Sequence, residues 1–281
     1  MNEAFSHFSA IYDGQPLSAY PMTARTETAD STTTTILTLP DGLTVTHICT
    51  AYPEFDACEW VTWYENPSDR PSGLLTEIWD GDCAVSFPEA PVARRTAQQP
   101  EPDDGTVIHA PLGSVCSESD FFIPRGVHDN QPVAQIWPEQ SRSYANVGGR
   151  SSDGQAPFFN VQDGDEGVVF AIGWTGQWHC TVARTVDSVR IRTGLADTHF
   201  RLLPHERIRT SSLVTMTYRG TFVQAQNKWR RLVRAHFSPK TPVPLPMFAN
   251  IWGGMTSQEA IDRIRAVQRA GLPMDCVWMD A

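Results

Sequence analysis

The sequence predicts a mainly β fold, in which a large antiparallel β-sandwich (a supersandwich) spans residues 1–240 and one parallel strand–helix–strand unit occupies residues 241–281. Three observations lead to this prediction. Short segments of alternating apolar and polar residues, separated by turn residues, fill most of the first part of the chain. Helical periodicity begins only near residue 224, and a proline-rich stretch then divides the chain in two.

The sandwich is predicted from strands that flank recognisable turns. Residues 36–39 and 43–48 alternate in polarity on either side of Pro40-Asp41-Gly42, where proline presets a turn dihedral and glycine accepts a positive φ. Further segments have the same strand character: Cys58–Tyr64, Val168–Trp174 and Ser188–Arg192. Residues 88–105 and 145–157 are rich in loop-forming residues. Several strands with little helix between them favour an antiparallel sandwich.

One amphipathic helix is predicted over Gln224–Phe237, because Trp229, Leu232 and Val233 fall on one face at helical spacing. The same stripe continues to His236 and Phe237. Four prolines follow within residues 239–246, which excludes a regular helix or a central strand there. We therefore place a linker and a domain boundary at about residue 240.

A compact strand–helix–strand pattern follows the linker. Met247–Asn250 and Asp275–Asp280 are short apolar segments that predict two buried strands. Between them Thr256 and Glu259 have the spacing of a capping box at a helix start, and Gly271 is a helix stop. The helix is expected to turn three residues inward: Ile261, Ile264 and Val267. A right-handed crossover of this length makes the two strands parallel.

Two parallel strands are too few to cover both faces of a sheet. We therefore expect this chain to be the N-terminal part of a longer protein whose second domain continues past Ala281. The alternative is a small closing subdomain, in which the two strands join the main sheets.

Composition narrows the possible functions. The chain has 281 residues, 41% of them hydrophobic and 19% charged, which is typical of a globular protein. No run of 18 apolar residues is present, so no membrane association is predicted. Residues 1–7 lack the pattern of a secretory signal, which predicts a cytoplasmic protein. The six cysteines match no zinc motif and indicate reduced thiols; no metal and no cofactor are predicted.

Charge is distributed unevenly along the chain. Residues 1–140 carry a net charge of −16, and residues 141–281 carry +6, for a total of −10. The overall negative charge argues against a general nucleic-acid binder. The asymmetry favours two surfaces that attract each other, within one chain or between the subunits of a homo-oligomer. An anionic-ligand site in the basic half is the alternative interpretation.

The strongest candidate site lies at the ends of the two parallel strands. Ligands of parallel α/β folds bind at the carboxyl ends of the strands. Trp252 follows the first strand and Asp280 ends the second, so we expect an indole and a carboxylate at one edge. This pair suits a sugar, whose C–H face stacks on an aromatic ring and whose hydroxyls donate to carboxylates. The alternatives are a packing role for Trp252 and a turn or cap role for Asp280.

Other chemistry-bearing segments favour structural roles. The acidic run Asp163–Gly167 lacks the bidentate glutamate of a calcium loop, which favours a hairpin turn. His109 and His179 are isolated, which favours structural histidines. The segment Trp174–Trp178 favours a hairpin with packed tryptophans over a sugar-stacking loop. No nucleophile elbow or P-loop occurs.

From Leu245 onward the sequence resembles the α-galactosidases of glycoside hydrolase family 36. Its PMFANIWGGMT is similar to the family's first barrel strand, which ends in Asn-x-Trp, and its GLPMDCVWMDA is similar to the second strand. Upstream, GRSSDGQAPFFNVQ, VVFAIGWTGQW, LLPHERIRT and QNKWRRLVRAHF resemble the family's sandwich domain and the helix before the barrel. The similarity runs in order over roughly residues 50–281.

This resemblance implies a β-sandwich followed by the start of a truncated (β/α)8 catalytic barrel. It implies hydrolysis of terminal α-galactosides with retention, by two carboxylates that follow later barrel strands. Both carboxylates would lie beyond residue 281, so this chain holds no catalytic residue and is predicted to be inactive alone. Asp280 and Trp252 match the positions that bind a galactoside or oligosaccharide substrate.

Two departures from the family pattern keep the exact sugar open. Asp280 is followed by Ala281 where the family often has a second acid, and Trp252 is followed by Gly253 rather than an acid. An α-N-acetylgalactosaminidase or a galactosyl-transfer enzyme therefore stays an alternative. A non-catalytic carbohydrate-binding or assembly module is the competing class, supported by the sandwich and the nine tryptophans.

Overall fold

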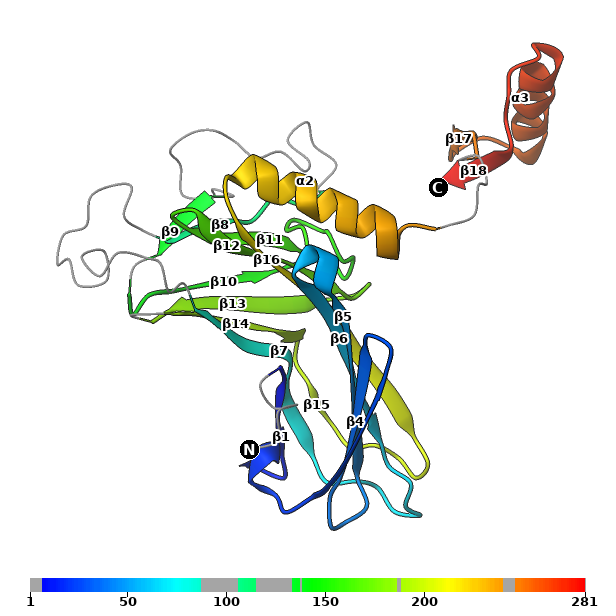
Figure 1. Ribbon diagram of the computed structural model, residues 1–281. Helices are drawn as coiled ribbons and strands as arrows, with labels where there is room; N and C mark the ends of the chain where they lie inside the picture. Colours follow the sequence, from blue (N-terminus) through cyan, green and yellow to red (C-terminus); the bar gives the residue numbers. More distant parts are fainter. Residues whose placement is uncertain are drawn as a thin grey trace. The chain divides into compact units, whose positions relative to one another are not determined.

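The computed structural model describes residues 7–86, 106–114, 133–136, 138–185, 188–239 and 246–280. The chain forms two compact units, a sandwich unit (Met1–Arg234) and a βαβ unit (Ala235–Ala281), seen in Figure 1. The predicted loop 88–105 and most of the predicted linker lie outside the described residues.

The described part of the sandwich unit contains two antiparallel sheets. The strands of the first are β1 (Ser9–Tyr12), β2 (Gln15–Pro16), β7 (Leu75–Ser86), β10 (Ser141–Ala145), β13 (Trp178–Arg184), β14 (Ser188–Leu195) and β15 (His199–Phe200). The strands of the second are β3 (Thr23–Ala29), β4 (Thr32–Thr38), β5 (Thr44–Tyr52), β6 (Ala57–Glu65), β8 (Thr106–His109), β9 (Val133–Ile136), β11 (Phe158–Asp163), β12 (Glu166–Gly173) and β16 (Arg207–Arg219). Short 3-10 turns lie at η2 (Leu17–Ala19) and η3 (Pro53–Phe55).

The first sheet has the order β10-β13-β14-β7-β1-β2, with β15 beside β7, and the second has the order β3-β4-β5-β6-β16-β12-β11-β8-β9. The predicted antiparallel β-sandwich is therefore confirmed. The turn at Pro40-Asp41-Gly42 connects β4 to β5: Gly42 has a φ of 97°, and the Leu43 N–H donates to the Asp41 carboxylate over 3.1 Å. The local turn chemistry and the strand alternation thus lead to the same hairpin.

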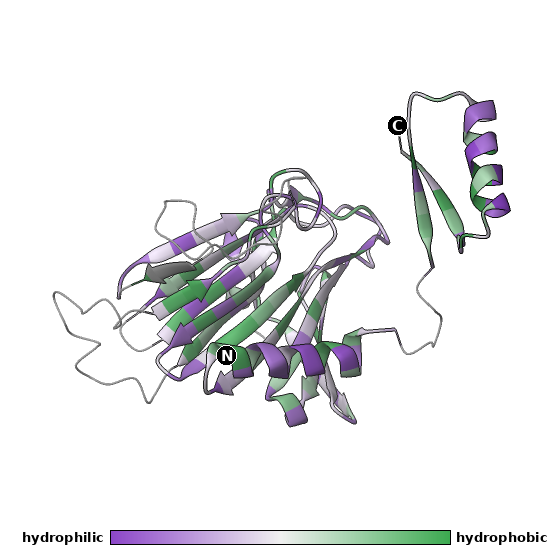
Figure 2. Cartoon of the chain, turned by 90° about the horizontal axis from the view of Figure 1, so that it is seen from above, coloured by the Kyte–Doolittle hydropathy of each residue, from purple (hydrophilic) through white to green (hydrophobic). Residues whose placement is uncertain are grey.

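Two apolar clusters fill the space between the sheets. The larger cluster joins Trp60 and Phe170 of the second sheet to Trp178 and Ile191 of the first. The smaller one gathers mostly N-terminal residues, including Phe8, Leu37 and Tyr64 around Leu75, together with Leu202. Figure 2 shows hydrophobic and hydrophilic residues alternating along the sandwich strands. In β6 this alternation buries Trp60, Thr62 and Tyr64, as the sequence pattern predicted, whereas β12 is buried at six consecutive positions because α2 also covers its outer face.

A helix covers part of the outer face of the second sheet. The helix α2 (Phe222–Leu232) continues as a π-helical turn, η4 (Val233–Phe237), so the helix predicted over 224–237 is confirmed. Its capping box is formed by Thr221 and Gln224, which the sequence analysis did not single out. Trp229 and Leu232 pack on the sheet, whereas Phe237 is exposed. The predicted apolar stripe ends early because the π turn changes the helical period.

The βαβ unit contains β17 (Phe248–Trp252), α3 (Ser257–Arg269) and β18 (Cys276–Asp280). The two strands pair in parallel, as predicted, with Phe248 opposite Cys276. The predicted capping box of Thr256 and Glu259 is present at the start of α3.

The prediction that Ile261 faces inward is wrong. This side chain is 41% exposed, whereas Ala260 is buried and Ile264 and Val267 are half-buried. The inward stripe therefore runs through 260, 264 and 267, which is a better i, i+4, i+7 series than the one that includes Ile261.

Candidate functional site

Trp252 and Asp280 lie at the same end of the βαβ unit. Each is the last residue of its strand, and their Cα atoms are register partners in the parallel pair. The backbone thus brings together the two positions that the sequence analysis singled out. Their roles in sugar binding stay predictions.

The loop that follows β17 opens a hollow at this end of the strand. Gly254 has a φ of 84°, a left-handed conformation that glycine adopts without steric cost. The loop and the first turns of α3 enclose a shallow cavity of about 530 Å³, lined by Gly253, Met255, Asp262 and Arg263 among others. A ligand-sized space therefore lies beside the end of β17.

Glu259 holds this loop to the helix. The Thr256 N–H and Oγ1 donate to the Glu259 carboxylate over 2.7 and 2.9 Å, and the Glu259 N–H donates back to Thr256 Oγ1 over 3.3 Å. The backbone hydrogen bond from Thr256, with its side-chain hydrogen bond, lowers the pKa of Glu259. Because the carboxylate already caps the helix, Glu259 is an anchor of the loop rather than a reactive acid.

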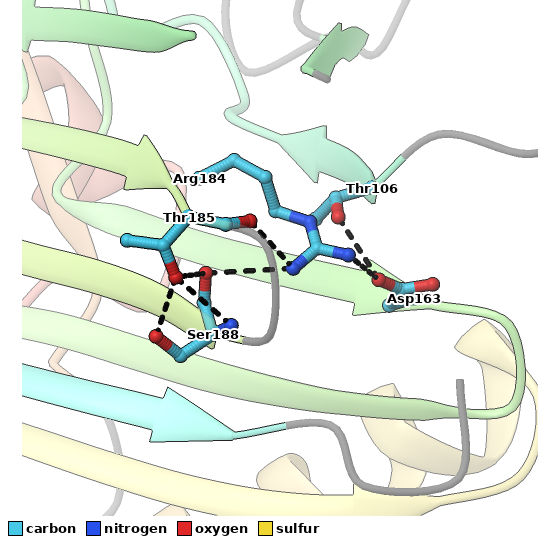
Figure 3. Close-up of polar contacts among 5 residues, drawn as sticks. All are labelled: Thr106, Asp163, Arg184, Thr185 and Ser188. Carbon is cyan, nitrogen blue, oxygen red and sulfur yellow. Dashed lines mark hydrogen bonds and ion pairs between the residues drawn. The ribbon is translucent and has the colours of Figure 1, made fainter. Parts of the chain in front are cut away.

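The acidic run Asp163–Gly167 forms a hairpin turn, as the sequence analysis favoured. Asp163 pairs with Glu166 at the junction of β11 and β12, and Gly164 has a φ of 63°. The Asp163 carboxylate is bound by protein donors: Arg184 Nη2 over 2.9 Å and Thr106 Oγ1 over 3.1 Å, as Figure 3 shows. Its oxygens therefore serve a buried ion pair within the sandwich.

The aromatic segment between β12 and β13 is mainly structural. Trp178 is fully buried, and its indole N–H donates to the Ser151 carbonyl over 2.7 Å. The buried Asn146 accepts from the Trp178 backbone N–H over 2.8 Å and donates to the Arg150 and Gly176 carbonyls. The glycine- and serine-rich loop is thereby fixed to the hairpin.

The two histidines considered earlier each pack against an aromatic ring. The ring centroid of His109 lies 4.4 Å from that of Phe222, and the centroid of His179 lies 4.3 Å from that of Trp79. Burial lowers the pKa of both imidazoles, so burial favours their neutral form. These contacts assign packing roles to both rings.

The described residues include no group of three or more His, Cys, Asp or Glu arranged to hold a metal ion. Within the same residues, no helix has the length and apolar character needed to cross a bilayer.

A second cavity, in the sandwich unit, was missed by the sequence analysis. It is lined by residues from β1, β7 and β14, including Trp79, Asp82, Arg190 and Arg192. The sequence carries only a weak signal for this cavity. Arg190 and Arg192 are two positions apart in a predicted strand, which places both side chains on one face of a sheet. Their acidic partner is more than 100 positions away, which strand alternation does not reveal.

No protein-family model matches the sequence, and no curated protein matches it either. Solved structures with the same fold are found at low sequence identity. The α-galactosidase from Lactobacillus brevis matches with a TM-score of 0.61 at 13% identity, over 97% of this chain and 37% of that chain. The family 36 α-galactosidase AgaA from Geobacillus stearothermophilus matches with a TM-score of 0.60 at 14% identity, over 97% of this chain and 39% of that chain.

The galactosidase domain of the α-galactosidase–sucrose kinase AgaSK matches with a TM-score of 0.63 at 12% identity, over 96% of this chain and 38% of that chain. Variants of AgaA have been solved in complex with raffinose and with stachyose. This chain thus spans somewhat more than a third of the length of these α-galactosidases. The resemblance inferred from the sequence motifs is confirmed at the level of the fold.

Proposed function

We propose that this chain is the N-terminal part of a retaining glycoside hydrolase that cleaves terminal α-galactosides in carbohydrate catabolism. The observation that carries the proposal is the parallel pairing of β17 and β18, with Trp252 opposite Asp280 at the end of both strands. The shared fold with family 36 α-galactosidases, over nearly the whole chain and about 38% of theirs, supports it.

In this proposal Asp280 accepts hydrogen bonds from galactose hydroxyls, and Trp252 lines the sugar pocket. Substrate contacts that strengthen in the transition state raise kcat/KM. The nucleophile and the acid/base are expected on later strands of a barrel, about 5–5.5 Å apart as retention requires. The same proposal includes a cytoplasmic location and a homo-oligomeric state. The free thiols of Cys58, Cys83 and Cys180 are compatible with the first of these, because the cytoplasm is a reducing compartment.

The first test uses the 281-residue chain and an aryl α-galactoside. We expect no hydrolysis above a matched blank, because the proposal assigns both reactive carboxylates to later strands. Measurable turnover by the purified chain would contradict this assignment.

The coding sequence offers a direct check: continuation past Ala281 with further strand–helix units supports the proposal, and a stop codon favours a non-catalytic module.

The second test concerns Asp280 in the longer protein. Asp280→Ala is expected to lower kcat/KM for the aryl α-galactoside by about 100-fold or more, since a charged hydrogen-bond acceptor to the sugar is lost. Asp69→Ala is the matched control, because this carboxylate is 96% exposed in the sandwich unit. An unchanged kcat/KM in the Asp280 variant would remove this residue from the site.

A further inference from the structure

The cavity of the sandwich unit is built around an irregularity in β7. Glu77 has a φ of 47°, and the register of β7 shifts against β1 between Ser9 and Ile11. The register of β7 against β14 shifts between Thr193 and Gly194. The two backbones approach closely there, since a Cβ on Gly194 would lie only 2.4 Å from the Ile78 carbonyl oxygen. Bulges of this kind redirect side chains and are frequent next to binding sites.

Asp82 forms the floor of this cavity. Its carboxylate accepts hydrogen bonds from Arg190 Nε over 2.7 Å and Nη2 over 2.9 Å, and from Ser9 Oγ over 2.7 Å. Arg192 Nε lies 3.4 Å away. Burial alone would raise the pKa of Asp82, but the hydrogen bonds from Arg190 and Ser9 outweigh it and lower the pKa. Asp82 is therefore a fixed anion that orients two guanidinium groups.

The rim of the cavity keeps polar groups available to a ligand. The side chains of Arg190 and Arg192 are 48% and 37% exposed, and both line the cavity. The side chain of Glu77 is exposed at the same rim. The two guanidinium groups supply donors and Glu77 supplies acceptors, so the rim can bind groups that donate and accept at once, as hydroxyls do.

The charge and the walls of the cavity indicate the class of ligand. Two arginines and two acids line it, so the formal charges cancel, and a bound anion would gain little net attraction. Trp79 supplies an aromatic wall; its ring is held by His179 on one side, and the Arg192 guanidinium lies 5.5 Å from the ring centroid. The volume of about 680 Å³ is within the usual range for small-molecule sites.

We propose that the cavity between β1, β7 and β14 binds a neutral saccharide unit without hydrolysing it. The pyranose hydroxyls accept from Arg190 and Arg192 and donate to Glu77, while the edge of the Trp79 ring, whose faces contact His179 and Arg192, meets the C–H groups. Asp82 is occupied by its ion pairs and does not serve as a general acid. All the residues of this cavity belong to the sandwich unit, and the proposal does not depend on the proposed hydrolysis.

The test is isothermal titration of the 281-residue chain with raffinose, with maltose, and with inorganic phosphate in separate runs. We expect at least one of the two sugars to bind with a dissociation constant on the order of 1 mM, and phosphate to leave the protein unaffected. Maltose contains no galactose, so its binding would support the cavity even if the α-galactosidase proposal failed. Phosphate binding in place of both sugars would overturn the saccharide assignment.

Two variants locate the binding site. Arg192→Gln is expected to weaken saccharide binding about tenfold, because a charged donor is replaced by a neutral one. Glu77→Gln replaces the charged carboxylate acceptor with a neutral amide and is expected to weaken binding several-fold. It serves as the second variant should Arg192→Gln fail to fold. Arg25→Gln, at an exposed arginine on β3, is the control and should bind as the parent does. Unchanged affinity in a folded Arg192→Gln or Glu77→Gln protein would overturn the site.

Discussion

At the scale of single residues, Asp80 is the least ordinary carboxyl group of the sandwich unit. It is almost fully buried between the sheets, and its Oδ2 accepts from the Ser211 hydroxyl over 2.5 Å and from the Ser211 N–H over 3.2 Å. Its Oδ1 has no hydrogen-bond partner among the described residues. Burial raises the pKa of Asp80 to about 6, although the hydrogen bonds from Ser211 lower it in part.

This raised pKa predicts a specific pH dependence of stability. The folded chain holds the Asp80 proton to a higher pH than the unfolded chain does. Its contribution to stability is therefore complete below about pH 4 and is lost as the pH rises through about 6. Asp80→Asn removes this titration. The difference in unfolding free energy between the variant and the parent should therefore shift in favour of the variant by on the order of 2 kcal/mol between pH 4 and pH 7.

The measurement is urea unfolding of both proteins between pH 4 and pH 7. Asp165→Asn, at an exposed position of the hairpin turn, is the control and should follow the parent across this range. A constant difference in unfolding free energy between the Asp80 variant and the parent would show that Asp80 does not titrate in this window.

At the scale of elements, a buried ion pair connects the two sheets. Asp163 ends β11 in the second sheet and Arg184 ends β13 in the first, and both side chains are at most 5% exposed. Arg184 Nη1 also donates to the Thr185 carbonyl over 3.1 Å, while Thr106 of β8 donates to Asp163 (Figure 3). The pair is thus hydrogen-bonded from both sheets, which offsets its desolvation.

Removing one partner should leave an uncompensated buried charge. Arg184→Leu is expected to lower the free energy of unfolding by about 3–5 kcal/mol, and the double variant Asp163→Leu/Arg184→Leu should lose less than the sum of the two single losses. The exposed pair of Arg25 and Glu27 is the control, where Arg25→Leu should cost less than about 1 kcal/mol. Additive losses in the urea midpoints would mean that the two charges do not stabilise each other.

At the scale of the whole molecule, the sandwich unit contains its own cores. The described members of the two apolar clusters, and of the apolar layer between α2 and the second sheet, all lie between Phe8 and Val233. A chain that ends at Pro239 should therefore fold, and its thermal midpoint should lie within about 2 °C of that of residues 1–281. Circular dichroism melting of both chains is the measurement. An insoluble truncated chain, or a midpoint lower by about 10 °C, would show that the sandwich depends on residues 240–281.

The strand alternation, the capping box at Thr256 and the parallel character of β17 and β18 could all be predicted from local sequence patterns. These features depend on neighbours within a few turns or on the handedness of one crossover, which local patterns encode. The same patterns predicted that Trp252 and Asp280 lie at the same end of the two strands, and the register of the pair agrees with this prediction.

The contacts between side chains far apart in the chain could not be predicted in this way, because they depend on how the strands assemble. Asp82 and Arg190 lie 108 positions apart, and Asp163 and Arg184 belong to different sheets. The inward side of α3 was also misjudged at Ile261, where the helix packs through Ala260 instead. Periodicity indicates that a strand or helix has an inward face, but the exact inward residues of α3, the order of strands in a sheet and the bulges in β7 depend on packing between segments.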